Sequence, residues 1–232
     1  MNKLTFNFNS KEVKKIKNPK EVLGGKGSNL SEMGRMGLPV PPGFIISTNV
    51  CKLFYKSKKK LNNKIIKQIK SELKIVEKEV KKKFGDLKNP LLLSVRSGAR
   101  VSMPGMMDTI LNLGLNDKTV VALSKKTSNE RFAKDSYRRF IQMYGNVVMG
   151  VESHHFEELI ENYKLTKGVL LDTELDKNDW DGLIKDFKRI IKEKTKKDFP
   201  QDVHKQLFGA ISAVFLSWES KRAKIYRKLN HI

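Results

Sequence analysis

The segment from Leu91 to Gly114 constrains the fold more than any other part of the chain. It begins with an apolar run, Leu91 to Val95, whose length and boundaries predict a buried strand. Residues 109–113 alternate in polarity well enough to predict a second strand. The segment therefore predicts two strands joined by an irregular loop, over residues 96–108.

This loop carries a candidate site for an anionic ligand. Arg96 and Arg100 follow the first strand, and a guanidinium group offers a planar set of donors that matches phosphate oxygens. The glycines beside them, Gly98 and Gly105, let the backbone come close to a ligand. An ordinary hairpin with surface arginines explains the same residues, and the residues alone leave both interpretations open.

A second glycine-rich stretch, residues 23–27 (LGGKG), predicts a tight turn that leads into a helix of about two turns. Leu30, Met33 and Met36 share one side of that helix. Exposed amides and Lys26 at a helix N-terminus suit a phosphate group. The spacing is not that of a P-loop, and a plain tight turn stays the alternative.

The charge of the chain raises the question of a nucleic-acid partner. Lysine and arginine number 47 against 25 acidic residues, which gives a net charge of +22. Basic surfaces bind phosphate backbones. The excess, however, is mostly lysine along predicted helices, without interleaved aromatic residues or a zinc, helix-turn-helix or RNA-recognition signature. We therefore favour solvated helix faces, and nucleic acid is not an expected partner.

The lengths of the apolar runs and the number of cysteines bear on membrane association and cellular compartment. No apolar run approaches the roughly 18 residues that a membrane span needs, and the N-terminus lacks the apolar region of a secretory signal. The single cysteine, Cys51, excludes an internal disulfide and fits a reducing compartment. We expect a cytoplasmic protein with no membrane partner, in which Cys51 has a packing role.

The rest of the chain is predominantly helical in pattern, with short strands expected near Leu4 and after the proline-rich residues 37–43. Helices are predicted over residues 49–84 (with a break near 61–63 and an end at Gly85), 116–126, 129–149, 154–164, 179–195 and 202–229. His154 and His155 are adjacent on one helix and point in different directions, so a shared metal ion is not expected. These elements predict an α+β fold in which residues 116–200 are all helical.

Four long motifs cover most of the sequence: LGGKGSNLSEMGRMGLPVPPGF, SVRSGARVSMPGMMDTILNLGLND, DSYRRFIQMYGNVVMGV and AVFLSWESKRAKIYRKLN. Through them the chain resembles the N-terminal part of the pyruvate phosphate dikinases. The phosphoenolpyruvate synthases share the G-G-K-G and S-V-R-S elements but do not usually carry S-M-P-G-M-M-D-T-I-L-N-L-G. A phosphoenolpyruvate synthase-type fragment is therefore the alternative within this group of phosphotransferases.

The resemblance implies an ATP-grasp architecture. Residues 1–115 plus 201–232 would form the N-terminal lobe, and residues 116–200 a helical inserted subdomain. In the family, ATP, phosphate and pyruvate yield AMP, pyrophosphate and phosphoenolpyruvate, with Mg²⁺ as cofactor. This chemistry belongs to pyruvate metabolism.

The resemblance also implies a set of site residues. Lys26 and Arg96 match family residues that grip the ATP phosphates, and we carry them over as the catalytic pair. The loop that contains Met103, Gly105 and Thr109 would close over the nucleotide. Arg139 matches a family arginine at the nucleotide cleft.

Other parts of the family's machinery match nothing in these residues. In the family, the second lobe with its magnesium-binding carboxylates, the phosphohistidine domain and the pyruvate barrel follow this region. We therefore expect the chain to be inactive alone, with the missing C-terminal domains as partners and Met103, Met106 and Met107 lacking their covering lobe. The full-length family member is expected to be a homodimer. A basic nucleic-acid-binding module and a non-catalytic remnant scaffold stay as alternatives.

Overall fold

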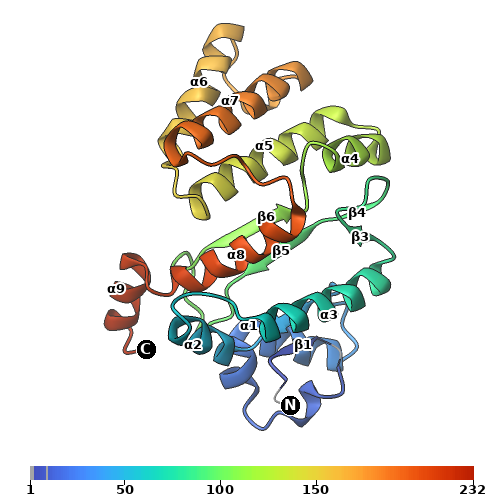
Figure 1. Cartoon of the computed structure of the whole chain (residues 1–232), viewed down its shortest axis with the longest axis vertical. Helices are drawn as coiled ribbons and strands as arrows, with labels where there is room; N and C mark the ends of the chain where they lie inside the picture. Colours follow the sequence, from blue (N-terminus) through green and yellow to red (C-terminus); the bar gives the residue numbers. More distant parts are fainter. Residues whose placement is uncertain (1–2, 9) are drawn as a thin grey trace. The chain divides into compact units, whose positions relative to one another are not determined.

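The computed structural model describes residues 3–8 and 10–232, and the predicted α+β class is confirmed (Figure 1). The strands are β1 (Thr5–Asn7), β2 (Phe44–Ile46), β3 (Lys83–Phe84), β4 (Pro90–Leu91), β5 (Leu93–Arg96) and β6 (Thr109–Leu113). The α-helices are α1 (Pro19–Arg35), α2 (Thr48–Lys56), α3 (Asn63–Val80), α4 (Thr119–Thr127), α5 (Glu130–Val147), α6 (Ser153–Lys167), α7 (Lys177–Thr195), α8 (Val203–Ser217) and α9 (Lys221–Leu229). Short 3₁₀ turns cover Val13–Lys15 and Asp172–Glu174.

The chain divides into two compact units. The first contains residues 1–81, 96–109 and 214–232, and the second contains residues 82–95 and 110–213. The predicted functional division, with residues 1–115 plus 201–232 as a lobe and 116–200 as an inserted subdomain, stays a prediction. None of the described helices combines the length and the apolar character required to cross a bilayer.

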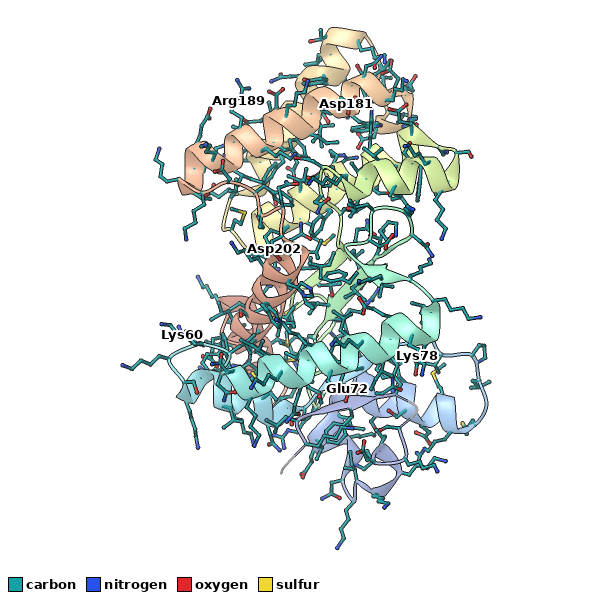
Figure 2. The ribbon with its side chains drawn as sticks, turned by 45° about the vertical axis from the view of Figure 1, so that its right-hand side comes forward. Lys60, Glu72, Lys78, Asp181, Arg189 and Asp202 are labelled. Atoms are coloured by element: carbon teal, nitrogen blue, oxygen red, sulfur yellow. The ribbon has the colours of Figure 1, made fainter. Side chains whose placement is uncertain are left out.

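In the first unit, a small sheet is covered by helices. β1 and β2 pair antiparallel with Phe6 opposite Ile45, and α3 packs on both strands. The apolar stripe of α3 is buried as its spacing predicts: Ile65, Ile69, Leu73 and Val76 are at most 2% exposed. On the same helix, Glu72 is buried and faces Lys3 beside β1, whereas Lys78 is exposed (Figure 2).

Helix ends in this unit follow local capping with one correction. Asn62 caps α3, because its side chain accepts a 2.9 Å hydrogen bond from the backbone N–H of Ile65. The predicted end at Gly85 is wrong: Lys81 adopts a left-handed conformation at the C-cap and β3 follows directly. Ser47 occupies the N-cap of α2 without a side-chain capping bond.

In the second unit, α4–α7 surround an aromatic core; on α7, Asp181 pairs with Lys134 of α5, whereas Arg189 is exposed (Figure 2). Tyr137, Phe140 and Ile141 of α5 are at most 1% exposed, and α5 packs against α7. Phe132, which the periodicity assigns to the same face, is 49% exposed. It lies in the first turn of α5, where the helix meets solvent.

The predicted buried strand at residues 91–95 is divided in the structure. β4 pairs with β3, and β5 pairs with β6. Residues of β5 alternate between half-buried and exposed instead of forming a continuous buried run. One face of this two-stranded pair meets solvent, and such pairs alternate in burial. The predicted strand at 109–113 is confirmed as β6.

The last predicted helix, over residues 202–229, is two helices. α8 ends at Ser217, whose hydroxyl donates to the carbonyl of Val214, and α9 begins after Ser220. The Ser220 side chain accepts from the backbone N–H of Ala223 at 3.3 Å and caps the second helix. Hydrogen bonds between a serine side chain and nearby backbone groups, like these two, compete with the backbone hydrogen bonds of a continuous helix and favour a break.

Candidate functional site

The glycine-rich residues 24–27 form a kink within α1. The predicted turn before a helix is present at Gly24, but a helical segment also precedes it, so that α1 begins at Pro19 and continues beyond the turn to Arg35. Gly24 interrupts it with φ 73° and ψ 169°, a conformation essentially restricted to glycine. A Cβ atom on Gly24 would overlap the carbonyl oxygen of Gly98. The kink therefore exists where the chain of residues 97–100 passes closest.

A backbone hydrogen bond connects the kink to the segment of residues 97–100. The N–H of Gly25 donates to the carbonyl oxygen of Ala99 at 2.9 Å. A Cβ atom on Gly25 would lie 3.2 Å from the carbonyl oxygen of Arg100, so this position also has little room for a side chain. The two motifs that sequence analysis singles out separately, G-G-K-G and S-V-R-S-G-A-R, are thus joined at their backbones within the first unit.

The core of the first unit fixes the position of this joint. Leu23, immediately before the kink, is 1% exposed and packs in a cluster with Phe6, Val13 and Ile45. After the kink, a Cβ atom on Gly27 would lie 3.0 Å from the Ile45 side chain, so α1 lies tightly on β2. Packing on both sides of the kink restricts its movement.

Three cations border the joint. Lys26 follows the kink on α1, Arg96 ends β5, and Arg100 lies in the passing segment; all three side chains are exposed. Within residues 3–8 and 10–232, none of the three forms an ion pair with a carboxylate. Uncompensated cations that flank a glycine-rich backbone create a positive potential, which suits an anionic ligand.

The loop of residues 102–108 follows this segment and contains two of the predicted ligand residues. Met103 is only 7% exposed, which corrects the expectation that it lacks cover. Gly105 is exposed with φ +72°, and a Cβ atom there would meet nothing within 4 Å. The N–H of Met106 donates to the carbonyl of Met103 at 3.1 Å, which closes the loop into a turn, and Thr109 begins β6.

Sequence analysis missed the residues that hold the far end of this loop. Arg222 on α9 forms an ion pair with Asp108, and its Nε donates to the carbonyl of Met106 at 3.2 Å. The N–H of Asp108 donates to the hydroxyl of Ser217 at 3.3 Å. The motif SWESKR contains Ser217 and Arg222, but it has no spacing signature that would have identified these two residues.

Arg139 lies in the second unit, on α5, whereas Lys26, Arg96 and the whole loop of residues 102–108 belong to the first. Its side chain is 61% exposed, and its Nε donates to Asp135 at 3.0 Å. The predicted ligands therefore fall in two units.

The neighbouring Arg138 has a different environment. It is 4% exposed, donates to Asp135 at 2.5 Å, and its guanidinium carbon lies 4.5 Å from the ring centre of Trp180. Burial lowers the pKa of Arg138, against the opposing charge of Asp135. Arg138 is a core residue, whereas Arg139 keeps an exposed guanidinium group despite its contact with Asp135.

Side chains that could bind a metal ion do not cluster among the residues that the structure describes. No group of three or more His, Cys, Asp or Glu side chains in the described part of the chain gathers closely enough to hold one. A hollow of about 450 Å³ lies on α6, lined by His154 and acidic neighbours, but all of its lining residues come from one helix. The rings of His154 and His155 lie 3.9 Å apart and share no third ligand. A Mg²⁺ site does not fit these residues.

Comparison with known proteins gives consistent results. The family model described as "Pyruvate phosphate dikinase, AMP/ATP-binding domain" matches residues 20–232. The chain is similar to the pyruvate, phosphate dikinases of Entamoeba histolytica (53% identity over 90% of this chain), Clostridium symbiosum (52% over 92%) and Rhizobium meliloti (48% over 100%). It spans about a quarter of the length of these relatives, 24–26%. The chain therefore belongs to the family of the pyruvate phosphate dikinase AMP/ATP-binding domain, as its motifs predict.

Proposed function

We propose that the chain binds ATP through Lys26 and Arg96 as the nucleotide-binding part of a pyruvate phosphate dikinase. The observation that carries this proposal is the hydrogen bond from Gly25 to Ala99. It joins the segment with Lys26 to the segment that follows Arg96, and both cations lack a carboxylate partner among the described residues. Two cations on joined, glycine-rich segments suit a polyphosphate.

The role of these residues in catalysis is positioning and charge stabilisation. Phosphoryl transfer spreads negative charge over the oxygens of the moving group, and fixed cations stabilise that charge. Arg96 would hold two phosphate oxygens through its planar donors, and Lys26 would act as a point charge beside the kink. Gly105 would bring its backbone N–H to the phosphates, and the Thr109 hydroxyl and Met103 would line the nucleotide. Arg139 would supply a further guanidinium group.

The whole reaction that we propose converts ATP, phosphate and pyruvate to AMP, pyrophosphate and phosphoenolpyruvate. It needs the parts of the relatives that this quarter of their length does not cover. Mg²⁺ would neutralise phosphate charge, and we expect the carboxylates that hold it to come from the parts of the relatives that this chain does not cover. This chain by itself is therefore expected to bind nucleotide without turnover.

Calorimetry with ATP and Mg²⁺ tests the proposal. Replacing Arg96 by alanine should weaken binding about 10- to 100-fold, the value of one or two hydrogen bonds to a charged group. Arg35→Ala is the matched control, because Arg35 is also exposed and its loss changes the net charge equally. Equal affinities of Arg96→Ala and Arg35→Ala would show that Arg96 is no phosphate ligand.

Two broader expectations accompany this function. The single, half-buried Cys51 suits a reducing compartment, and we propose a cytoplasmic location, which cell fractionation would test. We also propose that the complete protein is a homodimer, which light scattering of the full-length protein would test.

A further inference from the structure

We propose that Arg222 is a positioning residue of the nucleotide site, which holds the loop of residues 102–108 by its C-terminal arm. This inference rests on the proposed function, because the loop carries the predicted ligand Gly105. It assigns a role to α9, which the motif analysis left without one.

Three contacts from a short stretch of chain converge on the same arm of the loop. Arg222 pairs with the carboxylate of Asp108 and donates to the carbonyl of Met106. Ser217 accepts from the backbone N–H of Asp108 at 3.3 Å. The end of α8 and the start of α9 therefore bind three groups of the loop: the Asp108 carboxylate, the Met106 carbonyl and the Asp108 N–H.

The two arms of the loop are held by contacts with the rest of the first unit, whereas its tip is exposed. Met103 is buried at one arm, and Asp108 is held at the other, with 22% of its side chain exposed. Pro104 and Gly105 between them are exposed, and a Cβ atom on Gly105 would meet nothing within 4 Å. We therefore expect the loop to move mainly at its tip, which is the part that would meet the phosphates.

Arg222 can act as a fixed support because α9 is itself anchored. Arg227, one turn further along, lies with its guanidinium carbon 4.0 Å from the ring centre of Trp218 and donates to the Trp218 carbonyl. Ala223 is completely buried, and Ser220 caps the helix. These contacts hold the backbone from which Arg222 reaches the loop.

The chemistry of the contact selects arginine. A guanidinium group presents several donors in one plane and binds a carbonyl and a carboxylate together. A lysine ammonium is a point charge and keeps the attraction to Asp108 with a less defined geometry. Arg222→Lys should therefore retain part of the effect, and Arg222→Met should lose it.

The test combines amide hydrogen exchange with nucleotide affinity, on the purified chain. The amides of Met106 and Asp108 are direct reporters, because Met106 donates to the carbonyl of Met103 within the loop and Asp108 donates to the hydroxyl of Ser217 on α8. In Arg222→Met we expect both amides to exchange about tenfold faster without ligand, and ATP to bind about tenfold more weakly. Arg222→Lys should fall between this variant and the unchanged chain. Lys221→Met is the control, because it removes the neighbouring exposed charge and should alter neither measurement.

Each outcome decides a separate point. Unchanged exchange of both amides in Arg222→Met would overturn the proposal, and so would an equal loss of ATP affinity in Lys221→Met. Faster exchange with unchanged ATP affinity would show a structural contact only, and the positioning role would fall. If the unchanged chain binds no ATP, the proposed function of the isolated chain and the positioning role both fail. The exchange rates still decide whether Arg222 holds the loop.

Discussion

The backbone N–H of Gly25 donates a 2.9 Å hydrogen bond to the carbonyl oxygen of Ala99, which joins two glycine-rich segments that lie far apart in the sequence. Neither segment alone identifies a site, since each also fits an ordinary turn. Joined, they place the chain that carries Lys26 against the chain that follows Arg96. A site made by two segments depends on the residues that let the backbones approach each other.

Gly24 is the residue on which this approach depends. Gly24→Ala combines an unfavourable φ of +73° with an overlap on the Gly98 carbonyl, so we expect a loss of at least about 3 kcal/mol in the free energy of unfolding. Urea denaturation followed by circular dichroism measures it. Gly37→Ala is the control, because Gly37 has φ +77° but open surroundings, and should cost only about 1 kcal/mol. Similar losses in both variants would contradict a steric role of Gly98.

Local patterns predicted those parts of the fold that local interactions determine. The stripe of α3, the strand at residues 109–113 and the break between α2 and α3 follow from periodicity and capping. Asn62 caps a helix through its own third neighbour, Ile65, so its role is visible within four residues of sequence.

The parts that sequence reasoning missed depend on distant partners. The break after Ser217 is supported by Tyr55, whose hydroxyl donates to the Phe215 carbonyl at 2.8 Å. The role of Arg222 depends on Asp108, more than a hundred residues earlier. No periodicity encodes either contact, because tertiary partners determine them.

Substitution of the two adjacent arginines of α5 should affect the stability of the chain to different degrees. Arg138→Met removes a buried cation that pairs with Asp135 and stacks on Trp180, and should cost about 2–4 kcal/mol of unfolding free energy. Arg139→Met should cost less than about 1 kcal/mol, because its side chain is exposed, and should weaken ATP binding if Arg139 is a ligand. Circular dichroism during urea denaturation, together with calorimetry, separates the two roles. A stability loss confined to Arg139→Met would reverse the assignment.

Cys51 should react slowly with thiol reagents. Burial, with a contribution from the charge of Glu219, raises the pKa of its thiol to about 11. The thiolate is the reactive form, so at pH 8 its population falls about 100-fold below that of a thiol with a pKa of 9.0. The rate with a disulfide reagent should be lower by up to this factor in the folded chain and recover in urea. Equal rates in both states would show that the thiol is accessible and unperturbed.

Glu72 should make stability depend on pH. Burial raises the pKa of its carboxyl, although Lys3 Nζ, 3.5 Å from Oε1, opposes this, and Oε2 has no hydrogen-bond partner. The folded chain then holds the proton more tightly than the unfolded chain. As pH rises through the usual glutamate range to the raised pKa, the unfolded chain ionises first and stability falls. Above that window the loss is constant.

Glu72→Gln removes this titration while keeping the size of the side chain. Its free energy of unfolding should match that of the unchanged chain below the usual glutamate pKa and exceed it at pH 7, as urea denaturation at the two pH values would measure. Lys3→Met is the companion variant: without the cation that opposes the shift, stability should fall more steeply with pH. A difference between Glu72→Gln and the unchanged chain that is the same at both pH values would mean that burial does not perturb this carboxyl.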